Sequence, residues 1–153
     1  MSFNINLAGL DDLRTKLRAY GELVKDEVAI EGAAGMGLVI YLEARSRAPV
    51  SSKPHYFYGR NSKKNGVKYL IQPGTLRDAI YRVFSPEKSS GTLKMYRVSW
   101  NHTKAPHGFM AEFGTSRAAA KPFMGPSLSR LDDAIAAGKV RMAKKLDEIQ
   151  GQQ

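Results

Sequence analysis

Apolar residues recur at two different spacings in residues 1–50. Near the start, Phe3, Ile5 and Leu7 alternate with polar or small residues, which predicts a short half-buried strand. Apolar residues then recur at helical spacing over 10–20 and again over 22–48. Gly21 separates the two runs and predicts a helix end. This part of the chain therefore predicts a strand followed by a pair of helices, of which the second is the longer.

The second predicted helix has a run of small residues at its centre, namely Gly32, Ala33, Ala34, Gly35 and Gly37. Glycine costs about 1 kcal/mol relative to alanine inside a helix, so we expect another helix or another chain to approach closely here. A nucleotide-binding loop is disfavoured, because no strand precedes the run and its spacing is not G-x-G-x-x-G. The uncharged stretch 32–42 is shorter than the about 20 residues of a membrane span.

The middle of the chain changes from helical to extended character. Turn-forming residues dominate 51–73, which predicts a long loop, and Thr75 is placed to cap one helical turn. The stretches 80–84 and 94–100 are rich in β-branched and aromatic residues. They predict the two strands of a hairpin that turns over 86–91.

A final amphipathic helix is predicted to begin near Pro126 and to be interrupted at Gly138. Around its start we expect Phe113, Phe123 and Leu128 to be core residues. The predicted fold class is α+β: a small antiparallel sheet flanked by a long N-terminal helix pair and a C-terminal helix. With 153 residues, of which 42% are hydrophobic, the chain is expected to form a single domain over 1–153.

The sequence offers little catalytic chemistry. It contains no cysteine, which excludes disulfides, thiol catalysis and thiolate metal sites. His102, His107 and Glu112 form an H-x4-H-x4-E pattern that matches no metal motif, and together with His55 these histidines are expected in loops. Nucleophile elbows, paired catalytic carboxylates and phosphate-binding loops are missing from the sequence. We therefore expect neither an enzyme nor a cofactor.

The net charge of +10 is concentrated in the middle of the chain. Residues 51–105 carry eleven basic and two acidic side chains, whereas 1–50 carry six and seven. Such a segment attracts phosphates or an acidic partner surface. Residues 1–6 lack the basic and apolar regions of a signal peptide, so we expect a soluble product made in the cytoplasm.

Aromatic residues alternate with basic ones in the stretch 53–69, where Tyr56, Phe57 and Tyr58 precede Lys63, Lys64 and Lys68. This pattern can stack bases while it neutralises phosphates. The alternative is a loop whose aromatic residues pack on a neighbouring subunit. We favour this alternative, because no recognised nucleic-acid-binding fold surrounds the stretch, although charge alone permits weak contact with DNA.

Three stretches of the chain, read together, resemble the minor tail-component, or neck and tail-completion, family of long-tailed bacteriophages. The first is Gly9–Leu13 with the long helix that ends in Glu43–Val50, and the second is Gly74–Ile80. The third and most specific is Met110–Arg117 followed by Ala120–Leu128. It is similar to the family's V-E-F-G-T-S-R and A-x-P-F-x-x-P-x-L patterns.

The resemblance implies a structural virion protein that forms a ring, commonly of six copies, at the head–tail junction or upper tail. It would act in tail completion and head–tail joining, around the channel that DNA travels. Its partners would be copies of itself and the neighbouring head-connector and tail proteins, with no membrane. It would be made in the cytoplasm of the bacterial host and then join the virion. In the family pattern the first stretch runs almost directly into the second, so 51–73 is an insertion here, which we expect to adapt the protein to its own neighbours.

In such a ring we expect the subunit or partner interface to include Gly32, Gly35, Tyr56, Phe57, Tyr58, Thr115, Ser116 and Arg117. The basic residues expected to face DNA in the channel, or an acidic partner ring, are Lys63, Lys64, Lys68, Arg77, Arg82 and Arg97. Two alternatives stay open. One is a tail terminator that caps the tail tube, and the other is a basic nucleic-acid-binding protein with no virion role.

Overall fold

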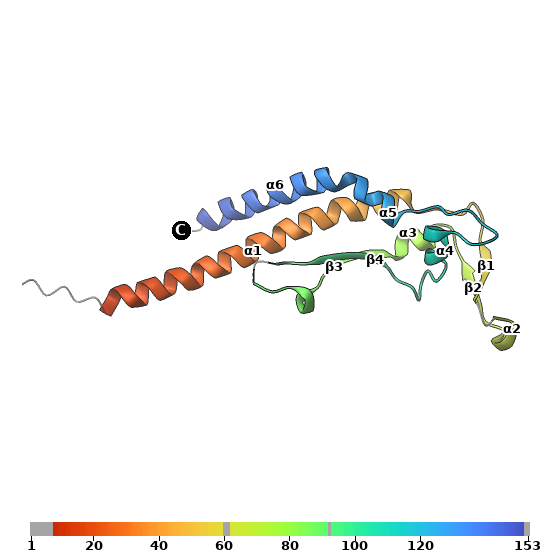
Figure 1. The fold of residues 1–153 in the computed structure, drawn as a ribbon, viewed down its shortest axis with the longest axis horizontal. Helices are drawn as coiled ribbons and strands as arrows, with labels where there is room; N and C mark the ends of the chain where they lie inside the picture. Colours follow the sequence, from red (N-terminus) through yellow and green to blue (C-terminus); the bar gives the residue numbers. More distant parts are fainter. Residues whose placement is uncertain (1–7, 60–61, 92, 152–153) are drawn as a thin grey trace, which may run out of the picture.

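Two antiparallel helices form the long axis of the protein. The computed structural model describes residues 8–59, 62–91 and 93–151. α1 (Ala8–Arg47) is one helix of 40 residues, about 60 Å long. α6 (Leu131–Gln150) runs back along it, and the hairpin of β3 (Ile80–Phe84) and β4 (Tyr96–Trp100) lies on the other side of α1 in Figure 1.

A second hairpin projects from the end of the molecule where α1 finishes. It pairs β1 (His55–Tyr58) with β2 (Lys68–Ile71), and α2 (Ser62–Asn65) lies at its tip (Figure 1). The remaining short helices are α3 (Thr75–Ala79), η1 (Pro86–Lys88), α4 (Gly108–Phe113), α5 (Met124–Ser127) and η2 (Leu128–Arg130). The protein is therefore α+β, as predicted, with two separate antiparallel sheets of two strands each.

The predicted end of the first helix at Gly21 is wrong, because α1 runs through this residue without a break. Gly21 has none of the positive φ that marks a glycine helix terminus. One glycine costs about 1 kcal/mol, which strong helix formers on either side can offset. The strand predicted from Phe3, Ile5 and Leu7 lies outside the described residues.

The glycines of α1 let α6 approach closely. A Cβ atom on Gly35 would lie 3.0 Å from the carbonyl oxygen of Ala137 and 3.2 Å from the Cα of Gly138. One on Gly138 would lie 3.0 Å from the carbonyl oxygen of Gly32. The expected close approach of a helix is confirmed, and the helix belongs to the same chain. The predicted interruption of the last helix at Gly138 is wrong, because α6 runs through this residue. Gly138 is the point at which α6 contacts α1.

Ion pairs continue this helix contact toward the free end of α6. The Lys145 ammonium lies 3.0 Å from the Glu27 carboxylate, and Arg141 lies 3.6 Å from Glu31. The hydrogen bond from Lys145 to Glu27 and the negative charge of that carboxylate raise the pKa of Lys145 above its usual value. All four side chains are partly exposed, so these ion pairs contribute little to stability. They help to align α6 along α1.

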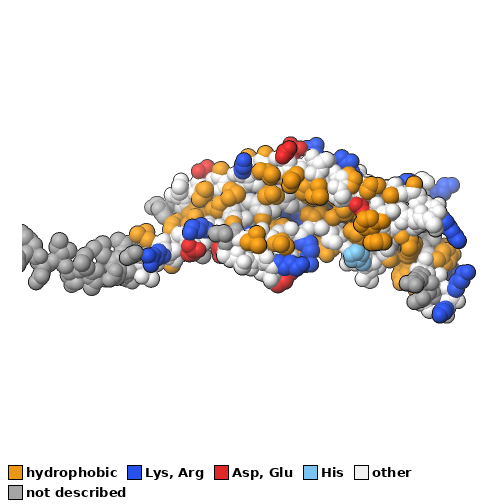
Figure 2. All heavy atoms as spheres, in the orientation of Figure 1, with side chains coloured by type: hydrophobic (Ala, Val, Ile, Leu, Met, Phe, Trp, Pro, Cys, Tyr) orange, Lys and Arg blue, Asp and Glu red, His pale blue; other side chains and the backbone are white. Residues whose placement is uncertain are grey.

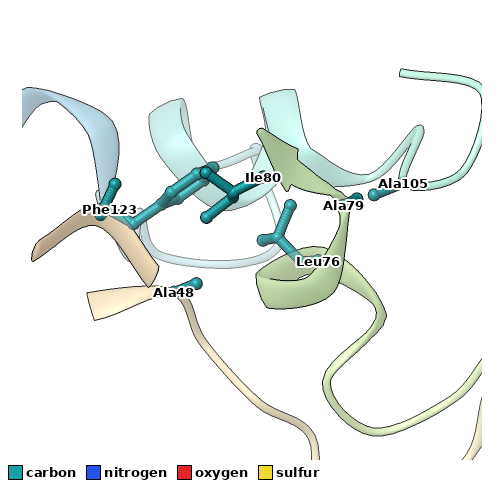
Figure 3. Close-up of a cluster of buried hydrophobic side chains, with 7 residues drawn as sticks. Ala48, Leu76, Ala79, Ile80, Ala105 and Phe123 are labelled. Atoms are coloured by element: carbon teal, nitrogen blue, oxygen red, sulfur yellow. The ribbon is translucent and has the colours of Figure 1, made fainter. Parts of the chain in front are cut away.

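The buried core is small and lies at the other end of the helix pair. It gathers side chains from α1, α3, β3 and two loops around Phe123 and Leu76, as Figure 3 shows: Ala44, Ala48, Leu76, Ala79, Ile80, Ala105 and Phe123. Phe123 is a core residue, as predicted. Phe113 and Leu128 are not, because 65% and 60% of their surface is exposed.

The β3–β4 hairpin is confirmed, with Arg82 opposite Val98 and Val83 opposite Arg97. The stretch 51–73, in contrast, is not the irregular loop that its composition predicts, because it contains the β1–β2 hairpin. The turn formers reside in the segments that enter and connect these strands. Thr75 lies inside α3 instead of capping it, and its hydroxyl donates to the Gln72 carbonyl oxygen at 2.8 Å.

We expect Gly138→Leu to lower the free energy of unfolding by about 1–3 kcal/mol, because the added side chain has no space between α6 and α1. Gly21→Ala is the matched control, since a Cβ atom there meets nothing within 4 Å. It should raise the free energy of unfolding by about 1 kcal/mol, by removing a glycine from a helix. Urea unfolding followed by circular dichroism measures both; equal effects of the two substitutions would contradict the close helix contact.

Candidate functional site

The most specific motif of the sequence is organised around one buried carboxylate. Glu112, at the end of α4, accepts backbone N–H groups of the segment that opens α5. Its Oε2 lies 2.7 Å from the nitrogen of Phe123 and 3.0 Å from that of Met124, and its Oε1 lies 2.8 Å from that of Gly125. N–H groups at the start of a helix have no hydrogen-bond partner within that helix. The Glu112 carboxylate therefore acts as the N-terminal cap of α5, although it is 11 residues before Phe123 in the sequence.

The environment of Glu112 keeps its carboxyl group ionised. Burial raises the pKa of this group, and the hydrogen bonds from the backbone of Phe123, Met124 and Gly125 lower it by more. The net result is a pKa below the usual value of 4.5. Glu112 therefore acts as a structural anion at neutral pH.

The loop 114–121 between α4 and α5 is closed by its own hydrogen bonds. Gly114 has a φ of 75°, and a Cβ atom there would lie 2.8 Å from the backbone nitrogen of Ala120. The Thr115 hydroxyl accepts the N–H groups of Arg117 and Ala118 at 3.2 and 3.0 Å. Of the residues predicted to form an interface here, Thr115 closes the turn, and Ser116 and Arg117 are exposed at its tip.

The aromatic residues of the insertion lie on opposite faces of the β1–β2 hairpin. Tyr56 and Tyr58 are 50% and 61% exposed, and the Lys68 ammonium lies 4.7 Å from the centre of the Tyr56 ring. Phe57 points the other way and packs beside the rings of Tyr69 and His107, with ring centres 6.3 and 6.2 Å apart. Phe57 thus attaches the hairpin to the body of the protein, and the two tyrosines remain available to a partner.

The histidines do not gather into a metal site. His102 packs on the Trp100 ring, whereas His107 faces His55 with ring centres 6.5 Å apart. Burial lowers the pKa of His107, and the nearby His55 lowers it further. Among the residues that the structure describes, no group of three His, Asp or Glu side chains is placed to hold a metal ion.

Basic side chains with few carboxylates nearby occupy the end of the molecule beyond the core. Figure 2 shows the Lys and Arg side chains at this end, around the β1–β2 hairpin. We call this region the basic end and define it by Lys53, Lys63, Lys64, Lys68, Lys104, Arg117 and Lys121, all of them exposed. Between Glu87 and Asp132 the sequence has one carboxylate, Glu112, which is buried.

Not all the predicted basic residues belong to the basic end. Arg77 is paired with Asp78 at 3.1 Å, and its hydrogen bond holds the pKa of that carboxyl below its usual value. Arg82 faces α1, where its guanidinium donates to the Ala34 carbonyl oxygen at 3.1 Å. Arg97 lies on the opposite face of the hairpin, because neighbouring positions on paired strands alternate. Of the six predicted residues, the structure brings Lys63, Lys64 and Lys68 together on one hairpin.

Gly32 and Gly35, predicted at a subunit interface, are covered by α6 of their own chain.

Nothing in the sequence indicated the apolar groove that lies beside these two glycines. A groove of about 560 Å³ runs between α1, β4 and the segment from α5 to α6. Most of its lining is apolar and includes Ala33, Met36, Ile40, Leu93, Met95, Tyr96, Val98, Met124, Leu128 and Leu131. Several of these side chains are exposed, including Leu93 at 58%.

The chain exposes more surface than a compact monomer of its size. Its accessible surface is 11165 Å², whereas a compact protein of 16.9 kDa exposes about 7,700 Å². Full exposure of the twelve residues outside the described part would account for about 1,900 Å² of the difference. About 1,500 Å² of excess remains, comparable to two interface faces of about 800 Å² each.

Comparison with protein-family models, with curated proteins and with solved structures finds no match to this chain. Within the part of the chain that the structure describes, no helix has the length and apolar character needed to cross a membrane.

We expect Glu112→Gln to lower the free energy of unfolding at pH 7 by about 1–3 kcal/mol, since the amide offers one oxygen to three N–H donors. Because the carboxyl pKa is lowered on folding, its contribution is complete above the unfolded value of 4.5 and is lost as the pH falls through the folded value. The difference between wild type and variant should therefore shrink below about pH 4.5.

Urea unfolding at pH 7 and at pH 3.5 measures this difference. Glu87→Gln is the control, because this carboxylate is 58% exposed and its nearest cation, Arg97, is 3.6 Å away. It should change stability by less than about 0.5 kcal/mol at either pH. A loss in Glu112→Gln that is the same at both pH values would contradict the role of the ionised carboxylate.

Proposed function

We propose that this chain is a structural virion protein of a long-tailed bacteriophage. It forms a ring at the head–tail junction or upper tail and serves in tail completion and head–tail joining. The alternative role within the same class of virion proteins is a tail terminator that caps the tail tube. In either role the protein acts through its surfaces, by binding further copies of itself and neighbouring connector and tail proteins, and not by catalysis.

The observation that carries this proposal is the excess of exposed surface, together with the many large hydrophobic side chains that are exposed. A monomeric protein rarely exposes contiguous apolar patches larger than a few hundred Å². Here the groove, the Phe109–Phe113 face of α4 and the outer residues of α6 are exposed together, with Phe109 at 60% and Val140 at 69%. Each subunit of a ring has two neighbours, and two faces of about 800 Å² would cover the excess surface.

The arrangement around Glu112 supports the same proposal. The two parts of the most specific motif, 110–117 and 120–128, are brought together by the hydrogen bonds of this carboxylate. Between them, the loop 114–121 presents exposed small and basic residues. A closed loop on a fixed base is suited to contact with a neighbouring subunit, since little conformational entropy remains to be lost on binding.

Sedimentation velocity over a concentration series tests the proposal. We expect a discrete species of about six copies, or its formation when isolated tail tubes or head connectors are added. Negative-stain images of that species should show rings. A chain that stays monomeric at every concentration, and that also fails to bind tails and connectors, would overturn the proposal.

The basic end favours one candidate from another class, a basic nucleic-acid-binding protein with no virion role. Seven exposed cations provide a phosphate-binding surface. Tyr56 and Tyr58 lie beside these cations, where they are free to stack on bases. This candidate predicts a monomer that binds DNA with an affinity that falls steeply with salt.

We expect Lys63→Ala, Lys64→Ala and Lys68→Ala, combined in one variant, to lower the slope of log K against log salt for duplex DNA by about three. The matched control removes three exposed lysines elsewhere, Lys88, Lys139 and Lys144, and leaves the same net charge. Fluorescence anisotropy at several salt concentrations measures both slopes. Equal losses in the two variants would show that net charge, and not the basic end, attracts DNA.

A further inference from the structure

We propose that the apolar groove binds residues 3–7 of a second copy of this chain, which add as a strand to the free edge of β4. The inference rests on the proposed function only in requiring that copies of the chain associate. It names the surfaces through which they do so.

The groove borders one strand of the β3–β4 hairpin. The sheet residues in its lining are Val98 of β4 and the segment Leu93–Tyr96 that leads into this strand, and none comes from β3. The opposite wall is formed by α5, η2 and the first turn of α6, with α1 as the floor. The groove therefore follows the edge of β4 that faces away from β3.

The main chain of β4 offers hydrogen bonds at this edge. At the two ends of the hairpin, the nitrogen of Ser85 donates to the oxygen of Met95, and the nitrogen of Asn101 donates to the oxygen of Ala79, both at 2.9 Å. Hydrogen-bonded and non-hydrogen-bonded pairs alternate in an antiparallel ladder. The N–H and C=O groups of Tyr96 and Val98 therefore point away from β3, toward an edge with no third strand among the described residues.

The sequence of residues 3–7 fits this edge. Phe3, Ile5 and Leu7 alternate with two asparagines, so an added strand would turn its apolar side chains into the groove and its polar ones outward. Residues 1–10 contain no charged side chain. The groove is matched to such an occupant, because its one charged lining residue, Lys94, is only 10% exposed and is paired with Asp26 at 3.0 Å.

The occupant must come from another copy of the chain. Ala33, the lining residue of α1 nearest to the start of the helix, lies 25 residues after Ala8, about 37 Å along the helix. Phe3 precedes Ala8 by five residues, which span at most about 18 Å when fully extended. Each copy would donate a strand at one end and accept one near its middle. Such a head-to-tail contact uses two different surfaces and can close into a ring.

Disulfide trapping tests the inference, and the absence of native cysteine makes its result specific. Ile5→Cys is combined with Met95→Cys in the groove, and separately with Val140→Cys on the outer face of α6. Both positions are in the full-length chain, and Val140 is the more exposed, at 69% against 37%. Random collision would therefore favour the control, whereas a strand on the edge of β4 brings the Ile5 and Met95 positions within the about 7 Å that a disulfide spans.

Under mild oxidation we expect at least about ten times more intermolecular disulfide from the Met95→Cys pair than from the Val140→Cys pair, seen as a ladder on a non-reducing gel. In parallel, Phe3→Ser, Ile5→Ser and Leu7→Ser, combined in one chain, should raise the concentration at which copies associate at least about a hundredfold. Asn4→Ser with Asn6→Ser should leave it unchanged.

Two results would overturn the inference. Rings that form normally in the triple serine variant and give no preferred disulfide would show that copies associate through other surfaces, and the proposed function would stand. A wild-type chain that neither associates nor cross-links, even with tails or connectors present, would overturn the inference and the proposed function together.

Discussion

The three hydrogen bonds of the Glu112 carboxylate hold the second half of the structure in place. They join the end of α4 to the start of α5, eleven to thirteen residues later in the chain. Phe123, whose nitrogen is one of the three donors, is at the same time a fully buried residue of the small core. The chain leaves this point through α5 and η2 into α6, so the path of α6 along α1 begins from an anchored position.

The apolar groove depends on the same arrangement. Met124, whose N–H group Glu112 accepts, and Leu128, three residues after the last of these donors, both line the groove. The floor is α1, and the far part of α6 is held to it by the contact of Gly32 and Gly35 with Gly138. A carboxylate at one end and three glycines further along thus define a groove whose shape does not depend on the small core alone.

The shape of the protein explains why so many apolar side chains are exposed. A helix of about 60 Å cannot be covered by a domain of this size, so its flanking hairpin and helix leave apolar side chains exposed. Seven exposed cations, in contrast, form the basic end beyond the core, and five of them are on the β1–β2 hairpin and the 114–121 loop. The apolar and the basic surfaces lie at different places along the molecule. The proposed contacts with further copies and with an acidic or nucleic-acid partner therefore use two separate surfaces.

Local sequence patterns determined much of this structure. Alternating β-branched and aromatic residues predicted the β3–β4 hairpin, helical spacing predicted the helical character of α1 and α6 but divided α1 in two, and the glycine run indicated a close helix contact. Each of these signals acts over a few neighbouring residues. Features that depend on contacts between distant parts of the chain were determined only by the tertiary structure. Gly21 and Gly138 have the same local preference to end a helix, and neither ends one; only the tertiary structure shows that Gly138 is needed where α6 meets α1, whereas Gly21 has no such contact. Phe113 and Leu128 have the apolar side chains of core residues and are exposed, because the core around Phe123 and Leu76 is formed by other residues. The use of Glu112 as a cap for α5 could not be read from its position, since the N–H groups that it accepts reach it only after the loop 114–121 has folded back.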